Sequence, residues 1–224
     1  MHVFIVGSGK LASELLKHLA LDPPFKIYRW QGAPASEEPA IVLHAGSGRE
    51  LEEVIAFGER TGSVLIELAT GSALRSRAPA CPVVLCPNTN ILMLKFMAML
   101  HRGGSLFAGS RITVTESHQA GKTSAAGTAL DIADALGLAA EDVVSVREPR
   151  VQETALRIPR EHLERHAVHV ISIEDGACSI SMETRVYGSS PYADGVARIV
   201  SAVRTHPLEQ RIHSITEFIA WGWL

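Results

Sequence analysis

Residues 2–12 read HVFIVGSGKLA, an apolar β-branched run followed at once by a G-x-G-x-x-A string that opens a helical pattern. Gly7 permits a tight turn, Gly9 lets the backbone approach a pyrophosphate, and Ala12 allows the helix to pack closely on the strand. The free N–H groups and partial positive charge of a helix N-terminus favour a phosphate there. This stretch predicts a dinucleotide-binding βα unit, although glycines that merely shape a turn are the alternative. The expected cofactor contacts are Gly7, Ser8, Gly9, Lys10 and Leu11.

The pattern of apolar residues changes near residue 90. Before it, short apolar runs alternate with helical patterns, which is typical of βαβ units around a parallel sheet. After it, strands with period-two patterning predominate, and Asp175-Gly176 between the last two is a type I′ hairpin signal. The fold class predicted is α/β, a doubly wound parallel sheet of Rossmann type plus an α+β domain. The strands are expected over 2–6, 25–29, 41–43, 64–68, 83–85, 111–116, 143–148, 166–174 and 177–187, and the helices over 10–19, 50–60, 91–100, 128–138 and 195–204.

The composition excludes several classes of partner. The chain has 224 residues, of which 46% are hydrophobic, and a net charge of −3, so neither nucleic acid nor membrane is an expected partner. Its longest apolar run, 91–100, is about half the length of a bilayer span and predicts a buried helix instead. The odd number of cysteines and the absence of a signal-peptide pattern predict a cytoplasmic protein with reduced thiols.

The second predicted strand lacks the acidic residue that usually binds the ribose hydroxyls in dinucleotide sites. It ends Ile27-Tyr28-Arg29-Trp30. Arg29 facing a 2′-phosphate would favour NADPH or leave the protein indifferent between NADPH and NADH. The alternative, which stays open, is that Arg29 is a solvated surface charge.

The string ESHQAGKTSAAGTA at 116–129 is the strongest candidate for chemistry. We expect His118 and Lys122 on a loop that follows a strand. Apart from Lys122, the run from Gly121 to Ala129 has only small side chains, so its backbone N–H groups can surround a carboxylate or phosphate. Lys122 can supply charge or a proton, and His118 can exchange a proton near neutral pH. A flexible loop with a chance His and Lys is the alternative.

The same string resembles the signature E-x-H-H-x-x-K-x-D-x-P-S-G-T-A of bacterial dihydrodipicolinate reductases. Further segments resemble that family in the same order along the chain. Leu68-Ala69-Thr70-Gly71 is similar to its G-T-T-G turn beside the nicotinamide, and Cys86-Pro87-Asn88-Thr89-Asn90 to its A-P-N-F-S segment. Ile41–Ser47 stands where the family has V-I-D-F-T, and Ser190–Ala197 resembles the stretch that returns the chain to the nucleotide domain.

The resemblance implies a reductase that moves hydride from NADPH or NADH to a cyclic imine dicarboxylate of lysine and diaminopimelate biosynthesis. His118 would be the catalytic acid/base group and Lys122 the proton donor. The cofactor would also contact Ala69, Thr70, Gly71, Pro87 and Asn88, and the substrate Gln119, Lys122, Gly127 and Thr128.

The resemblance also implies an architecture. A dinucleotide domain would comprise 1–90 and 190–224, and a substrate and oligomerisation domain 91–189, with the catalytic cleft between them. Members of the family are tetramers, so a homotetramer is expected, with a dimer second. Ile171, Ile173, Ile180 and Met182 imply an open sheet face that another subunit would cover.

The departures from the family signature keep other functions open. Gln119 replaces the second histidine, the Asp and Pro of the signature are missing, and Ala126 replaces its serine. His44-Ala45-Gly46 stands in place of D-F-T. The alternatives are therefore a reductase of another imine or keto acid, or a non-catalytic NAD(P) sensor. A zinc site at Cys81 and Cys86 is disfavoured because no second ligand pair accompanies them. His162, His166 and His169 have helix-like spacing for a metal, but 166–174 reads better as a strand, so no metal is expected there either.

Overall fold

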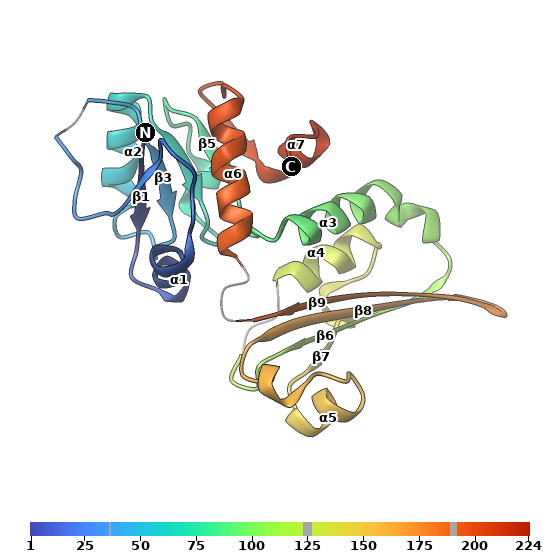
Figure 1. The fold of residues 1–224 in the computed structure, drawn as a ribbon. Helices are drawn as coiled ribbons and strands as arrows, with labels where there is room; N and C mark the ends of the chain where they lie inside the picture. The colour runs from blue at the N-terminus through green and yellow to red at the C-terminus, as the bar shows by residue number, and fades with distance from the viewer. Residues whose placement is uncertain (36, 123–126, 189–191) are drawn as a thin grey trace. The chain divides into compact units, whose positions relative to one another are not determined.

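The computed structural model describes residues 1–35, 37–122, 127–188 and 192–224 (Figure 1). Residues 123–126 of the small-residue run lie outside these ranges, as do the start of the predicted returning segment and the predicted domain boundary at 189/190. The chain divides into two compact units, Met1–Leu94 with Tyr192–Leu224, and Lys95–Pro191. In the described ranges, no helix is both long enough and apolar enough to span a membrane.

The first unit contains a six-stranded sheet in the order β10-β5-β4-β3-β1-β2, with every neighbouring pair parallel. From β1 the chain moves to β2 on one side and then returns to β3 on the other side of β1. That reversal makes the β1/β3 boundary a topological switch point. The Rossmann-type doubly wound sheet expected from the sequence is confirmed. Its strands are β1 (His2–Val6), β2 (Lys26–Arg29), β3 (Ile41–His44), β4 (Val64–Glu67), β5 (Val83–Leu85) and β10 (Ile212–Ser214).

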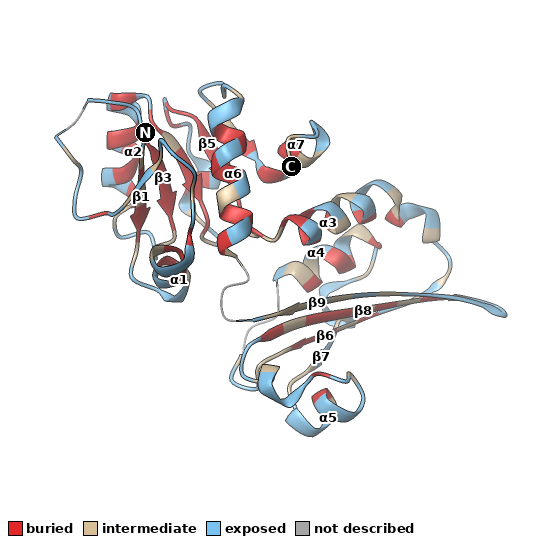
Figure 2. Ribbon diagram, in the orientation of Figure 1, coloured by how far each residue is buried: buried red, intermediate tan, exposed pale blue. Residues whose placement is uncertain are grey.

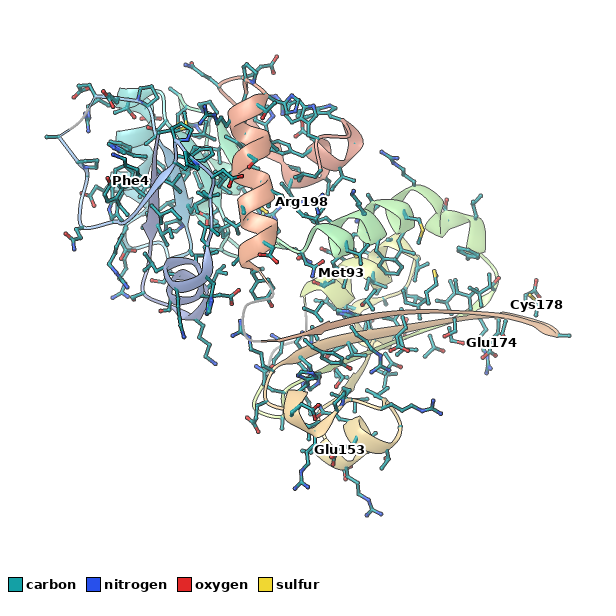
Figure 3. The ribbon with its side chains drawn as sticks, viewed as in Figure 1. Phe4, Met93, Glu153, Glu174, Cys178 and Arg198 are labelled. Carbon is teal, nitrogen blue, oxygen red and sulfur yellow. The ribbon has the colours of Figure 1, made fainter. Side chains whose placement is uncertain are left out.

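Helices cover both faces of this sheet, and β3 is buried along its whole length, as Figure 2 shows. Leu15 of α1 (Lys10–His18) and Ile199 of α6 (Ala193–Thr205) belong to the core on one face. Val54 and Phe57 of α2 (Leu51–Thr61) belong to the core on the other face, where Phe4 of β1, labelled in Figure 3, packs edge-on against Phe57. Burial on both faces explains the nearly continuous apolar runs of these strands.

The C-terminal tail contains an element that the sequence did not predict. β10 pairs with β5, Ile212 opposite Val83, and leads directly into α7 (Ile215–Ala220). Ser214 and Glu217 form a capping box at the start of that helix. A three-residue strand with a histidine and a serine has no apolar run that a pattern search can find.

The second unit is built on a four-stranded sheet in the order β7-β6-β8-β9. β7 is parallel to β6, whereas β6 with β8 and β8 with β9 are antiparallel. α4 packs against β6, and the long β8–β9 hairpin carries Glu174 and Cys178 near its tip, labelled in Figure 3. The elements are β6 (Arg111–His118), α4 (Gly127–Ala135), β7 (Val144–Val146), α5 (Pro149–Thr154), β8 (His166–Asp175) and β9 (Cys178–Tyr187). They are preceded by α3 (Ile91–Gly103), and the boundary between the two units falls at Leu94/Lys95 within that helix.

Several details of the second unit differ from the predictions. His118 is the last residue of β6 rather than part of a loop, because its backbone pairs with Ala167 of β8. The hairpin turn is Gly176-Ala177, and Gly176 alone of the two has a positive φ, which excludes type I′.

The predicted burial of apolar residues in this part of the chain was also partly wrong. Ile171 and Ile173 are buried, because Ile171 lies opposite Val114 of β6, the strand on which α4 packs, while Ile180 is 42% exposed. α3 is not buried on all sides, since Leu92 and Met99 are exposed.

Candidate functional site

The turn between β1 and α1 has the geometry that the glycine string predicts. Gly7 adopts φ 113°, and a Cβ on it would lie 2.8 Å from the carbonyl oxygen of Ala45. Gly9 is the N-cap of α1, and no side chain caps the helix or places a negative charge in its first turn. Ser8, Gly9 and Lys10 are exposed, and Leu11 is half-buried. An uncapped helix N-terminus beside a turn that only glycine can form fits the pyrophosphate of a dinucleotide.

The other predicted cofactor residues lie at the carboxyl ends of the parallel strands, as the glycine turn does. Ala69, Thr70 and Gly71 follow β4, Pro87 and Asn88 follow β5, and Arg29 is the last residue of β2. Arg29 is exposed on the edge strand. The backbone N–H of Ala69 already donates to Glu67 at 2.8 Å, so this predicted contact has a partner within the protein.

A buried histidine–carboxylate pair, to which the sequence analysis assigned no role, also lies at these strand ends. Nδ1 of His44 lies 2.9 Å from both carboxylate oxygens of Glu67, and each side chain is 1% exposed. Glu67 also accepts hydrogen bonds from the N–H of Ala69 and from Oγ of Ser72. The sequence did contain a signal for this pair, because a polar residue ends each of two apolar strands: His44 follows three apolar residues, and Glu67 follows three more.

In the second unit, Glu116 and His118 are two residues apart on β6 and therefore point to the same face. Nδ1 of His118 lies 2.7 Å from Oε2 of Glu116. Glu116 has no exposed side-chain surface, and the His118 side chain is 16% exposed. Donation from Nδ1–H fixes the imidazole so that Nε2 is the nitrogen that can exchange a proton.

Glu116 is held by two further donors. Oγ of Ser145 and a guanidinium nitrogen of Arg147 each lie 2.5 Å from its Oε1 atom. Burial by itself would raise the pKa of Glu116, but the hydrogen bonds from His118, Arg147 and Ser145 outweigh burial and lower the pKa to about 2. Glu116 is therefore an ionised orienting group for His118 at any physiological pH.

Arg147 also holds the turn that carries Lys122. Its Nε donates to the backbone carbonyl of Lys122 at 3.1 Å, and the N–H of Lys122 donates to the carbonyl of Gln119 at 3.0 Å. His118, Gln119 and Lys122 are thus brought together at the end of β6. Of the other predicted substrate residues, Gly127 is exposed and Thr128 half-buried, both at the start of α4.

Arg147 and Gln152 are residues of this site that the sequence analysis missed. Gln152 is fully buried and donates from Nε2 to the carbonyl of His118 at 2.7 Å. Arg147 follows a three-residue strand, and Gln152 lies in the short helix α5. Nothing in their spacing connects them with residues about thirty positions earlier, because only the pairing of β7 with β6 brings them there.

Two further histidines of this unit, His166 and His169, are buried and hydrogen-bonded within it. Burial, followed by the charge of His118, lowers the pKa of His169 to about 4, so its ring is neutral at pH 7, with Nδ1 2.9 Å from the hydroxyl of Thr184. His166 forms hydrogen bonds with Oγ of Ser117 through Nε2 and with the backbone carbonyl of His162 through Nδ1. In the part of the chain that the structure describes, no three His, Cys, Asp or Glu side chains are grouped to hold a metal. Cys81 and Cys86 are buried free thiols.

Comparison with known proteins connects these sites with a family. No protein-family model matches the chain. It is 29% identical over 154 residues to 4-hydroxy-tetrahydrodipicolinate reductase 2, chloroplastic, of Arabidopsis thaliana, a match that covers 62% of this chain and 44% of that protein. It is 35% identical over 96 residues to the probable 4-hydroxy-tetrahydrodipicolinate reductase 2, chloroplastic, of Oryza sativa subsp. japonica, covering 40% and 30%. The chain therefore spans less than half the length of these curated relatives.

A solved structure has the same fold over nearly the whole chain. It is the dipicolinate-bound dihydrodipicolinate reductase from Paenisporosarcina sp. TG-14, with a TM-score of 0.67 and 14% sequence identity, covering 96% of this chain and 97% of that one. At this identity the likeness establishes the fold, while the plant reductases supply the relation in sequence. The resemblance expected from the motifs is confirmed: the chain is similar in sequence to plant 4-hydroxy-tetrahydrodipicolinate reductases and in fold to a solved dihydrodipicolinate reductase.

Proposed function

We propose that this protein is a nicotinamide-dependent reductase that transfers hydride from NADPH or NADH to a cyclic imine dicarboxylate of the dihydrodipicolinate type. The observation that carries the proposal is the hydrogen bond from His118 to the buried carboxylate of Glu116. It orients His118 at the end of β6, directly before the turn that leads to Lys122. A buried ionised carboxylate that fixes an imidazole is a common arrangement for acid–base catalysis. The relation in sequence to named reductases supports the same reaction class.

The first unit would bind the cofactor. Gly7, Ser8 and Gly9 would receive the pyrophosphate at the start of α1, and the segments after β4 and β5 would receive the nicotinamide half. When bound, the nicotinamide supplies the hydride. Arg29, exposed at the end of β2, would face the 2′-phosphate of NADPH.

The second unit would bind and protonate the substrate. Gln119, Gly127 and Thr128 would bind a substrate carboxylate, and the cationic Lys122 would lie beside it. Lys122 donates the proton that completes the reduction, and His118 exchanges a proton through Nε2 while Glu116 and Arg147 hold its orientation. Hydride goes to the unsaturated carbon and the proton to its neighbour in the reduced bond, so charge and atoms balance.

The direct test is oxidation of NADPH and of NADH with freshly generated dihydrodipicolinate precursor, followed by the loss of the reduced nicotinamide's absorbance. Lys122→Ala should lower kcat by about 100-fold or more with little change in cofactor affinity, since proton transfer contributes about 10²–10⁴-fold. Lys95→Ala, an exposed lysine on α3, is the matched control and should leave turnover unchanged. Equal activity of the wild type and Lys122→Ala would refute the role of Lys122.

Gln119 favours one second candidate, a reductase of a related imine or keto acid. It replaces the imidazole of the signature by a neutral amide directly after His118, which changes the charge available to a second substrate carboxylate. The same assay with monocarboxylate imines and keto acids decides between the substrates. Cofactor binding without turnover of any of them would favour the NAD(P) sensor.

We also propose a homotetramer, or failing that a dimer, located in the cytoplasm. β9 is an edge strand of its sheet, and Ile180 on it is 42% exposed, so a second copy of the chain would cover it. A reducing compartment suits three free cysteines. Light scattering of the purified protein measures the mass, and Ile180→Glu should shift it toward the monomer.

A further inference from the structure

His44 stands at the topological switch point of the first sheet. It is the last residue of β3 and lies in register with Val6 of β1 on one side and Glu67 of β4 on the other. Ligands of doubly wound folds bind outside the carboxyl ends of the strands at this point. The position of His44 in the topology is therefore one where a side chain meets a ligand.

Among the described residues, His44 forms hydrogen bonds through one of its two ring nitrogens, Nδ1. The Glu67 carboxylate accepts from the N–H of Ala69 and the hydroxyl of Ser72, one at each oxygen, and it accepts the Nδ1–H of His44 as well. Nε2 is then left with its lone pair as a hydrogen-bond acceptor. It is buried and has no hydrogen-bond partner among the described residues.

A second orphaned acceptor faces the same point. Oε2 of Glu50, the residue before α2, is also buried without a partner. A Cβ on Gly46 would lie 3.1 Å from Nε2 of His44, 3.2 Å from Oε2 of Glu50 and 3.6 Å from Cα of Gly7. Gly46 thus lies close to two buried acceptors and to the turn that precedes α1, and any larger residue there would press on both.

We propose that His44 Nε2 and Glu50 Oε2 together accept hydrogen bonds from the vicinal hydroxyls of a ribose, the one on the nicotinamide side of the bound dinucleotide. This inference rests on the proposed nucleotide site. A phosphate brings no hydrogen-bond donor to two acceptors and is repelled by the carboxylate, whereas a sugar diol offers two donors. The two nucleosides extend to opposite sides of the pyrophosphate, and β3 lies on the same side of β1 as the predicted nicotinamide segment after β4.

The two sides of the switch point differ in what they offer a ribose. β2 ends on Arg29 and offers no acidic side chain there. On the other side of β1, an imidazole at the end of β3 and a carboxylate just before α2 offer two acceptors. Arg29 on the far side of β1 is left to the adenosine half of the cofactor.

Binding of nucleotide fragments tests the proposal without turnover. Dissociation constants are measured by calorimetry for NADPH, ADP-ribose, which keeps the terminal ribose but lacks nicotinamide, and ADP, which lacks both. His44→Asn keeps an amide N–H where Nδ1 meets Glu67 and removes only Nε2. It should weaken NADPH and ADP-ribose about three- to tenfold, as expected for one lost hydrogen bond, and leave ADP unchanged. Glu50→Gln, which leaves the His44–Glu67 pair intact, should weaken the same two ligands by at least as much.

His213→Asn is the matched control, because His213 is a 1% exposed histidine on β10, an edge strand that two other strands separate from β3 in the same sheet. It should leave all three dissociation constants unchanged. Equal weakening of ADP and NADPH by His44→Asn would mean that the pair only shapes the glycine turn, and would overturn the proposal. Unchanged binding in both variants, or weakening of NADPH but not of ADP-ribose, would also overturn it. A wild-type protein that binds none of the ligands would instead refute the proposed function itself.

Discussion

Each unit of this protein contains a buried carboxylate bonded to Nδ1 of a histidine, and the two pairs differ in what surrounds them. In the second unit, Glu116 also receives a guanidinium hydrogen bond from Arg147, and the His118 ring is partly exposed. In the first unit, the described partners of Glu67 besides His44 are neutral donors, and the His44 ring is buried. Exposure therefore suits the proposed proton exchange at His118, and enclosure suits the proposed fixed hydrogen bonding at His44.

The largest effect is expected when the charge that orients His118 is removed. Glu116→Gln keeps the shape of the side chain but can present its amide N–H to His118 and leaves Arg147 without its anion. We expect kcat to fall by about 10²–10⁴-fold, while NADPH affinity in the other unit stays unchanged. Initial rates and calorimetry on the same preparation measure the two quantities. A kcat within a factor of a few of the wild type would remove Glu116 from the mechanism.

The second unit should lose stability in two separate pH ranges as the solution is acidified. The pKa of Glu116 is about 2, below its ordinary 4.5, so its stabilising contribution is complete above pH 4.5 and is lost as the pH falls toward 2. The lost contribution is about 3 kcal/mol, since each pKa unit corresponds to about 1.4 kcal/mol. His169, with a pKa of about 4 against an ordinary 6.5, is buried in its neutral form, so stability is already lost as the pH falls from 6.5 to 4. The free energy of unfolding, measured by urea titration at a series of pH values, should fall in both pH ranges. Glu116→Gln should abolish only the fall in the more acidic range.

Alanine substitutions at the two glycines of the first turn should have different effects, one on stability and the other on cofactor binding. Gly7→Ala forces a Cβ to within 2.8 Å of a carbonyl oxygen at a positive φ and should lower the free energy of unfolding by more than about 1 kcal/mol. Gly9→Ala meets nothing within 4 Å and has φ −74°, so stability should change by about 0.5 kcal/mol or less, while the added methyl group obstructs the pyrophosphate. Thermal unfolding and NADPH binding measure the two effects. Loss of stability in both variants would contradict the assignment of Gly9 to the ligand.

Serine substitutions sharpen the contrast between the two carboxylates. Ser72→Ala removes one of the few donors to Glu67 and should cost about 1.5–3 kcal/mol. Ser145→Ala should cost less, about 1 kcal/mol, because Arg147 and His118 still satisfy Glu116. Urea unfolding of both variants at pH 7 gives the two values. The opposite order would show that Arg147 contributes little to the second pair.

Much of the first unit was predictable because its signals are local. The strand–glycine–helix stretch at 2–12 contains its own turn chemistry, and the apolar runs that follow it give nearly every strand of the parallel sheet. β10 was missed because three residues with two polar side chains leave no pattern, and its pairing with β5 brings together positions about 130 residues apart. The second unit was less predictable at its edges, and His118 was placed on a loop because nothing local shows that β6 continues to pair with β8.

The sequence by itself determined the doubly wound fold, the glycine turn and the residue types of the His118–Lys122 segment, because each depends on residues within one or two elements. Only the tertiary structure decided which polar groups meet. Arg147 and Gln152 reach β6 through β7, and His44 meets Glu67 at the ends of neighbouring strands. The physical reason is that a buried charge or imidazole must find its hydrogen-bond partners wherever the packed strands end, and strand register, not spacing along the chain, sets where that is.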